Sequence, residues 1–328
     1  MTLRPKASVI VVNWNGMKHL PDCFAALAAQ TFRNFECLMV DNGSTDGSLE
    51  FMKQHHPWVR LLPLGENQGF CGGNNAALKE VQGEYVALLN NDTAVAPTWL
   101  ESLCRALDEH PEIGFCASKM MRFYERDTID TAGDLVTTAC NTLDRGRGTS
   151  GLPEFDVDAE VFGACAGASI YRWALLERVG WLDEDFYFCF EDIDLSFRAQ
   201  LAGFRCLYVA GAVVYHKWGG TMSVKDGWRI AYSQRNIEFV WLKNMPAALM
   251  LRYFHERVIY WLGSAVHFAR QGQLRPFCKA KWSALRMLPT MLRKRRQIQS
   301  SRVISNAELS KHLESKWLGA KFRRMLNG

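Results

Sequence analysis

The chain has 328 residues, 48% of them hydrophobic, which is enough for one large core or two small ones. Its net charge of +5 is uneven: residues 270–328 hold fifteen Lys and Arg against two acids and carry +13, which leaves −8 for the preceding 269 residues. The acidic body argues against a nucleic-acid partner, and the basic tail predicts either contact with an anionic membrane or a solvated helical face.

The ten cysteines include no CxxC pair, so a zinc site or a thioredoxin-like motif has little support. Most of them lie in apolar runs, where cysteine behaves as a small hydrophobic residue. The N-terminal residues lead directly into an apolar segment without a signal-peptide cleavage pattern. Reduced thiols and no export signal predict a cytoplasmic location, on the inner face of the cell membrane if the tail binds lipid.

Strand and helix patterns alternate through the first 120 residues. Short apolar runs rich in branched residues predict buried strands at 7–14, 35–42, 59–64, 85–92 and 113–121. Helical spacing occupies 19–30, 44–56, 72–83 and 97–110, with Ser44 expected as an N-cap and Pro97 near the first turn. This alternation predicts a mostly parallel sheet with helices on both faces, which binds ligands beyond the carboxyl ends of its strands.

The pattern weakens between residues 121 and 161, and 144–156 is expected to be an exposed, mobile loop. A helix is then predicted at about 191–202, a strand at 206–218, and helices throughout from Trp228. Residues 239–269 are strongly apolar, but Lys243, Arg252, His255, Glu256 and Arg257 interrupt them and argue against a membrane-spanning helix. Two interpretations stay open for this segment: an amphipathic helix at a membrane interface, or packing against the rest of the chain.

Polar residues follow three of the predicted strands. Asn13 and Asn15 can hydrogen-bond a nucleobase or ribose, although Asn-Gly is also an ordinary turn signal. Asp41 can accept a hydrogen bond from a pyrimidine N–H or a ribose hydroxyl. The glycine-rich turn from Glu66 opens a helix whose N-terminus favours phosphate, and it matches neither a Walker A motif nor a GxGxxG motif.

Two further motifs predict the chemistry. Asp92, in LLNNDT, can hold Mg²⁺ or Mn²⁺ together with substrate phosphates, and His216 is either a nitrogen ligand or a structural residue. The motif EDIDL places three acids on one helix, where neighbouring positions diverge by about 100°. We therefore expect Asp192 to act as a base and the other two acids to support it. Arg198 has the spacing for an ion pair with Asp194.

These motifs, in this order between Ala7 and Thr221, resemble the family-2 inverting glycosyltransferases, and in particular the rhamnosyltransferase-like enzymes of O-antigen and other cell-surface polysaccharides. The resemblance implies a GT-A fold, a nucleotide-diphosphate-sugar donor and a divalent metal, Mg²⁺ or Mn²⁺. It implies catalysis by Asp192 with Glu191, and metal binding by Asp92 and His216, although the family's DXD-type motif here reads Asn90-Asn91-Asp92. The nucleotide contacts would come from Asn13, Asn15, Asp41, Asn67, Gly69, Asn75 and Asn91.

The expected organisation is a catalytic domain at 1–225, with a nucleotide-sugar half at about 1–120 and an acceptor half at about 121–225, followed by a basic helical extension at 226–328. The expected reaction moves a sugar, with rhamnose or a similar deoxyhexose favoured, from a dTDP or UDP donor to a lipid-linked or cell-surface glycan. Two alternatives are a non-catalytic, membrane-attached scaffold that keeps the fold and a nucleic-acid-binding protein that uses the basic tail.

Overall fold

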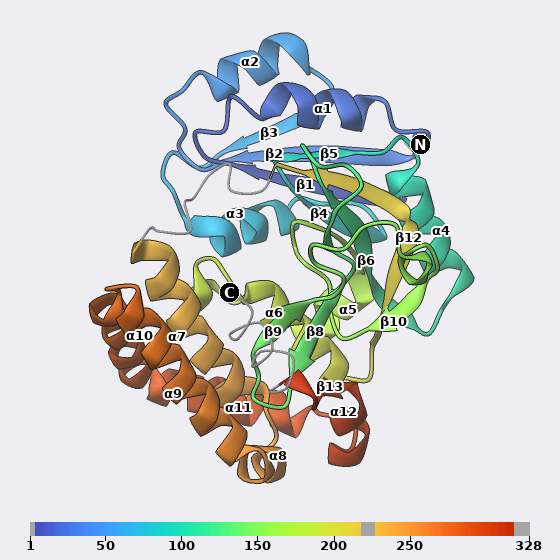
Figure 1. Cartoon of the computed structure of the whole chain (residues 1–328). Helices are drawn as coiled ribbons and strands as arrows, with labels where there is room; N and C mark the ends of the chain where they lie inside the picture. The colour runs from blue at the N-terminus through green and yellow to red at the C-terminus, as the bar shows by residue number, and fades with distance from the viewer. Residues whose placement is uncertain (1–3, 218–226, 318–328) are drawn as a thin grey trace.

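The computed structural model describes residues 4–217 and 227–317. Within these ranges a ten-stranded mixed sheet has the order β10-β12-β6-β11-β4-β1-β2-β3, with β5 added to β12 and β7 to β6 (Figure 1). Neighbours from β4 to β3 are parallel, whereas β11 is antiparallel to β4 and β6. The strands are β1 Ala7–Asn13, β2 Phe35–Asp41, β3 Arg60–Pro63, β4 Tyr85–Asn90, β5 Thr93–Val95, β6 Ile113–Arg122, β7 Ile129–Thr131, β10 Ala159–Val161, β11 Ala168–Arg172 and β12 Arg205–His216.

Helices cover both faces of this sheet, because its strands are apolar on both sides. Alternate residues of β1 divide between two cores: Val9 and Val11 pack with α1 and α4, and Ile10 packs with α3 and α6. Figure 1 shows α1 and α2 on one face and α3 on the other. The helices are α1 Leu20–Ala28, α2 Ser48–His55, α3 Gly69–Leu78, α4 Trp99–Glu109, α5 Trp173–Val179 and α6 Glu191–Leu201, with the 3-10 turns η1 Pro153–Phe155 and η2 Glu184–Phe186.

The C-terminal helices gather to the left of α6 and below it in Figure 1. They are α7 Gly227–Asn244, α8 Ala247–Arg252, α9 Phe254–Arg270, α10 Leu274–Arg286, α11 Leu288–Ser300 and α12 Asn306–His312. The long helix α7 packs against α6, α10 and α11 and so joins this group to the sheet domain. No helix in the described ranges combines the length and apolarity needed to cross a bilayer.

The mostly parallel sheet with flanking helices confirms the predicted fold class, but several local predictions are wrong. The N-cap of α2 is Gly47, with φ +83°, and not Ser44. The Ser44 hydroxyl oxygen instead accepts hydrogen bonds from the Asn13 side chain and the Asn15 N–H, at the end of β1. Pro97 lies immediately before the N-cap Thr98 of α4, near the first turn as predicted.

The weakly patterned segment from 121 to 161 is also more ordered than predicted. It contains β7, β10 and two strands of a second small sheet, β8 Asp134–Thr137 and β9 Thr142–Asp144. The third strand of that sheet, β13 Leu313–Glu314, interrupts the tail that was expected to be helical throughout. The predicted domain boundary at 225 and the end of the motif reaching Thr221 lie outside the described residues.

Candidate active site

Three polar side chains form a hydrogen-bonded chain across the carboxyl ends of β1, β2 and β4. The parallel register pairs Asn13 with Asp41 and Val12 with Asn90, so the residues after these strands meet at one edge of the sheet. The Asn91 amide donates to Asn13 Oδ1 (2.7 Å), and the Asn13 amide donates to Asp41 Oδ1 (3.4 Å). The fold thus brings together three residues that the sequence predicts to contact the nucleotide.

Asn15 lies at the rim of this edge and shapes the loop after β2. Its φ of +48° is in the left-handed region, which Asn tolerates better than most residues. The Asn15 N–H donates to Ser44 Oγ (2.9 Å), and its Oδ1 accepts from the Thr45 N–H (2.8 Å). The Ser44 N–H in turn donates to Asp41 Oδ2 (3.0 Å), so both oxygens of the Asp41 carboxylate are held in place.

The glycine-rich turn before α3, which the sequence predicts to favour phosphate, packs closely against the side chain of Tyr187. The Asn67 Oδ1 accepts from the Gly69 N–H (2.9 Å), which starts the helix. Gly69 has φ +75°, and a Cβ at this position would lie 2.5 Å from the Tyr187 ring. Asn67 and Gly69 therefore seat an aromatic side chain beside the strand ends.

The hydrogen bonds of Asn75 argue against its predicted contact with the nucleotide. Its amide donates to Leu182 O (2.8 Å) and to Glu184 Oε1 (2.9 Å). Its Oδ1 accepts from the Leu182 N–H (3.2 Å). Because both amide hydrogens and the carbonyl oxygen are used within the protein, Asn75 has a structural role: it ties α3 to the segment before α6.

Asp92 and His216 converge beyond the ends of β4 and β12. Their closest atoms, Asp92 Oδ1 and His216 Nε2, are 3.4 Å apart, and His216 Nδ1 lies 2.7 Å from Asp130 Oδ2. Burial alone would raise the pKa of Asp92, but His216, together with His19 and the Asp92 N–H, lowers that pKa below its ordinary value. Burial alone would lower the pKa of His216, but Asp130 and Asp92 raise it to about 9.

The Asp92 and His216 pair fits a small divalent cation. Asp130 engages Nδ1 of the imidazole, which leaves Nε2 directed at the Asp92 carboxylate, an arrangement that orients histidine ligands in metal sites. No group of three or more His, Cys, Asp or Glu side chains in the described ranges has the geometry of a complete metal cage. Two protein ligands are sufficient for Mg²⁺ or Mn²⁺ when substrate phosphates supply further oxygens.

Glu191 and Asp192 open α6 and form a carboxyl pair of raised proton affinity. Asp192 is half-buried, with Oδ2 accepting from the Ala166 N–H (3.2 Å) and Oδ1 from the Ile193 N–H (2.8 Å). Burial raises the pKa of Asp192. Glu191 is buried, its Oε2 has no hydrogen-bond partner in the described structure, and burial together with the charge of Asp192 raises its pKa. A carboxylate in this state can accept a proton.

The base candidate and the metal candidate lie near the same strand end. The Ala166 N–H contacts Asp192, and the next residue, Gly167, accepts through its carbonyl from the Asn90 N–H (2.9 Å) at the end of β4. Asp92 follows two residues later. A short backbone segment therefore connects the two carboxylates, which are a hundred residues apart in the sequence.

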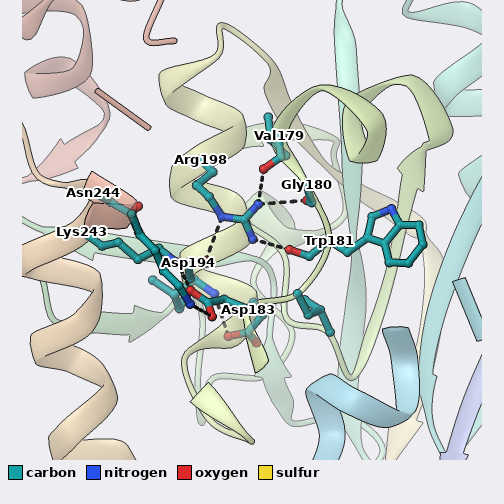
Figure 2. A network of polar contacts seen from close by, with 12 residues as sticks. Val179, Gly180, Trp181, Asp183, Asp194, Arg198, Lys243 and Asn244 are labelled. Atoms are coloured by element: carbon teal, nitrogen blue, oxygen red, sulfur yellow. Dashed lines mark hydrogen bonds and ion pairs between the residues drawn. The ribbon is translucent and has the colours of Figure 1, made fainter. Parts of the chain in front are cut away.

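Asp194, the third acid of the motif, lies in a buried ion network (Figure 2). It forms the predicted pair with Arg198 (2.9 Å), which also donates to the carbonyls of residues 179–181. Lys243 of α7 bonds Asp194 (2.8 Å) and Asp183 (2.5 Å), and Asn244 donates to Asp194 (2.8 Å). Asp194 and Arg198 thus anchor α6 to α7.

Sequence reasoning missed several residues of this region. Asp130 and Lys243 are the clearest examples, and Asp134 is a buried carboxyl whose pKa is raised by burial and then by Asp192. Asp130 and Asp134 fall in the segment where the strand pattern is weak, and Lys243 appeared only as an interruption of an apolar run. The sequence signal that could have identified Asp130 and Asp134 is the presence of three aspartates, with Asp144, in a segment that otherwise lacks a clear pattern.

The sequence profile described as "Glycosyl transferase family 2" matches residues 8–180, more than half of the chain, so the chain belongs to this family. A curated relative, the N-acetylglucosaminyl-diphospho-decaprenol L-rhamnosyltransferase of Mycobacterium tuberculosis, is 28% identical over 235 residues, which cover 63% of this chain and 75% of the relative. The chain spans only 25% of the length of another relative, the uncharacterized protein y4gI of Sinorhizobium fredii, with 27% identity over 234 residues.

Two solved structures are similar in fold. S. aureus TarS 1–349 in complex with UDP-GlcNAc has a TM-score of 0.54 and 20% identity, over 90% of this chain and 91% of TarS. The mannosyltransferase PcManGT from Pyrobaculum calidifontis, in complex with GDP-Man and Mn²⁺, has a TM-score of 0.51 and 16% identity, over 92% of this chain and 86% of PcManGT. At these identities the likeness concerns the fold, which is GT-A.

Proposed function

We propose that the protein transfers a sugar from a nucleotide-diphosphate donor to an acceptor hydroxyl, with inversion at the anomeric carbon. The observation that carries the proposal is the presence of two carboxylates of opposite character near the end of β4. Asp92 has a lowered pKa and faces His216, which suits a cation. Asp192 has a raised pKa, which suits a general base. Transfer from a diphosphate leaving group requires both.

In this mechanism Asp192 takes the proton of the acceptor hydroxyl while that oxygen bonds the anomeric carbon. The bond from the anomeric carbon to the diphosphate breaks on the opposite side, and its electron pair leaves with the diphosphate. Glu191 would support the base as a second buried carboxyl beside it, and its own pKa is raised by burial and then by the charge of Asp192. The ion pair of Asp194 with Arg198 would keep Asp192 in position by fixing α6, the helix that carries it.

The proposed metal is Mg²⁺ or Mn²⁺, held by Asp92 and His216. When bound, such an ion stabilises the negative charge that develops on the departing diphosphate. The support from this chain is the converging pair itself, with Asp130 behind the imidazole. The Mn²⁺ in the PcManGT complex supports the same choice by analogy.

The proposed nucleotide site lies across the ends of β1 and β2. Asp41 would accept hydrogen bonds from the base or ribose, with Asn13 and Asn91 beside it and Asn15 at the rim. Its carboxylate is held by the Asn13 amide and the Ser44 N–H, so it is already oriented. Asn67 and Gly69 would complete the site from the α3 side. Asn75 is left out of this set for the reason given above.

For the sugar and the acceptor, we favour rhamnose or a similar deoxyhexose from a dTDP or UDP donor and a lipid-linked or cell-surface glycan. The support is the name of the mycobacterial relative, which acts on a decaprenol-linked acceptor.

The C-terminal helices offer a surface that suits a membrane-bound acceptor. On α10, Phe277, Ala280 and Ala284 are buried, so this side packs inside the protein as one of the two sequence interpretations expects. Other positions of α8–α11 expose large apolar side chains: Leu251, Phe254, Ile259, Trp261, Leu262, Val266, Leu274, Trp282, Leu285 and Leu292. Seven exposed cations lie on the same helices: Arg252, Arg270, Arg275, Lys279, Arg286, Arg293 and Arg296.

The charge of this surface favours anionic lipid as its partner. Glu256 is the only Asp or Glu between residues 247 and 300, and it is bonded to the Trp317 indole (2.6 Å). Exposed apolar and cationic side chains without competing acids are typical of helices that lie in a membrane interface. We therefore place the enzyme on the inner face of the cell membrane, bound peripherally through α8–α11.

A panel of nucleotide sugars tests the donor assignment. The protein is heated with each dTDP-, UDP- and GDP-sugar, with and without Mn²⁺ or Mg²⁺, and donor hydrolysis is followed in parallel. We expect a metal-dependent rise in melting temperature with one donor class, and slow hydrolysis of that donor. Asp41→Asn is expected to lose the rise and Glu109→Gln, an exposed acid of α4, to keep it. Absence of any shift would favour the scaffold interpretation.

A further inference from the structure

The loop that joins η2 to α6 has a backbone conformation that its residues rarely adopt. Tyr187, Cys189 and Phe190 have φ of +65°, +66° and +68°, although none is glycine. Tyr187 also has ψ −59°, and the Phe188 N–H donates to Phe186 O (2.8 Å), which makes a γ-turn of the rare, strained kind. Such a conformation persists only where its surroundings hold it.

One buried side chain of α7 holds most of this loop. Asn236, fully shielded from solvent, directs its amide nitrogen at three carbonyl oxygens, those of Phe186 (2.9 Å), Phe188 (2.8 Å) and Cys189 (2.8 Å). The neighbouring Arg235 Nε donates to Asn236 Oδ1 (2.9 Å). Because the oxygen is occupied by a donor, the nitrogen must face the loop.

The remaining carbonyls of residues 185–190 are held as well, by donors from three helices. These donors are Arg235 Nη2 for Asp185 (2.7 Å), the Cys71 N–H for Tyr187 (3.1 Å) and the Asp194 N–H for Phe190 (2.9 Å). Arg235 Nη2 also donates to the Phe186 carbonyl that Asn236 contacts (3.1 Å). The loop is therefore fixed between α3, in the proposed nucleotide-binding half, and α7. It ends at Phe190, the residue before Glu191.

We propose that Asn236 is a positioning residue for the reaction: it holds the loop 186–190 in its strained form and thereby sets the direction in which Asp192 leaves the start of α6. The inference rests on the role of Asp192 given above. In this proposal α7 contributes to catalysis, although the sequence analysis assigns these residues to the helical extension at 226–328. A small displacement of a base lowers the rate of transfer more than the affinity for the donor.

The test compares three variants of the full chain. Asn236→Asp keeps the shape of the side chain but places an acceptor against the carbonyl oxygens, and Asn236→Gln keeps the amide donor on a longer side chain. Ile237→Ala removes buried volume from the same turn of α7 and leaves the Asn236 amide in place. We expect Asn236→Asp to lower kcat per folded enzyme roughly tenfold or more with donor KM nearly unchanged. Asn236→Gln should recover part of that loss, and Ile237→Ala should lower only the melting temperature.

A second readout does not depend on catalysis. Cys189 is half-buried in the loop and Cys278 is exposed on α10, so the labelling rate of Cys189 by a thiol reagent, relative to Cys278, reports release of the loop. We expect the Cys189 thiol to be labelled faster in Asn236→Asp than in the wild type, and at the wild-type rate in Ile237→Ala. Two results would overturn the inference. In one, Asn236→Asp has the same Cys189 labelling rate and the same kcat as Ile237→Ala. In the other, Asn236→Asp labels faster but keeps the kcat of the wild type. If the wild type turns over no donor, the function proposed above fails, and labelling alone decides whether Asn236 holds the loop.

Discussion

Asp134 is a buried carboxyl with one oxygen, Oδ2, that has no hydrogen-bond partner in the described structure. Burial, and then the charges of Asp192, Asp144 and Asp130, raise its pKa against the opposing charge of Arg147. A raised pKa in the folded state means that folding is favoured while the group is protonated. The free energy of unfolding should therefore fall as the pH rises from the ordinary aspartate pKa of about 4 towards the folded value.

The variant Asp134→Asn removes this titration. We predict that its free energy of unfolding, minus that of the wild type, increases between pH 4 and pH 8, as measured by urea denaturation. The exposed Asp127→Asn is the control, and its difference from the wild type should stay within about 0.5 kcal/mol at every pH. Parallel pH curves for Asp134→Asn and the wild type would contradict the assignment.

Asp130 acts on the proposed metal site through His216. Its Oδ2 fixes the Nδ1 side of the imidazole, and loss of such a partner typically weakens metal affinity by about 10–100-fold. We predict this loss of Mn²⁺ affinity for Asp130→Ala, measured by calorimetry without donor. Asp144→Ala is the matched control, because Asp144 shares Arg147 with Asp130 but does not contact His216. Equal affinities in the two variants would rule out this role.

At the scale of residues, the sequence suggests candidate roles for side chains but not the contacts that position them. Asp92, Asp192 and the ion pair of Asp194 with Arg198 could be expected from motif and helical spacing. Asn75 could not be separated from a true ligand-binding residue, because its partners lie more than a hundred positions away. Asp130 was hidden for the same reason: its partner His216 follows 86 residues later.

At the scale of elements, the attachment of α7 and α11 to α6 depends on buried charges. Lys243 is almost completely buried and contacts both Asp183 and Asp194, and Lys294 of α11 bonds Asp185 (2.7 Å) and Asp183 (Figure 2 shows the Lys243 part). Removal of one partner leaves the others buried without compensation, which typically costs about 3–5 kcal/mol.

We therefore predict that Lys243→Met lowers the free energy of unfolding by about 3 kcal/mol or more in urea denaturation. Arg122→Met is the control, since Arg122 forms an exposed pair with Glu125 on β6, worth less than about 1 kcal/mol. Similar small losses in both variants would show that the network is not needed to hold the helices.

The strands and helices of the first 120 residues follow from local pattern, because buried parallel strands are continuous apolar runs and the helices between them are amphipathic. The segment 121–161 did not follow, since β7 to β10 are only three or four residues long, and two of them pair with distant strands, β10 with β12 and β8 with β13. Ser44 looked like an N-cap locally, but its hydroxyl bonds Asn13 across the site.

At the scale of the whole molecule, the positive charge of the C-terminal part of the sequence lies largely on α8–α11, where cationic and apolar side chains are exposed together. We predict that Arg286→Gln combined with Arg293→Gln weakens binding to vesicles that contain anionic lipid by roughly tenfold or more, since each cation near such a surface contributes about 1 kcal/mol. Lys53→Gln with Lys79→Gln, an equal charge change on α2 and after α3, should leave sedimentation with vesicles unchanged. Equal losses in the two pairs would point to net charge alone.

The central claim is that Asp192 is the base of a sugar transfer, and the turnover of Asp192→Asn tests it most directly. With the donor identified by the panel, kcat should fall about 10²–10⁴-fold, the usual contribution of a general base, while the donor-induced rise in melting temperature is retained. Asp127→Asn, an exposed acid, should keep full turnover. A kcat for Asp192→Asn within tenfold of the wild type would contradict the account.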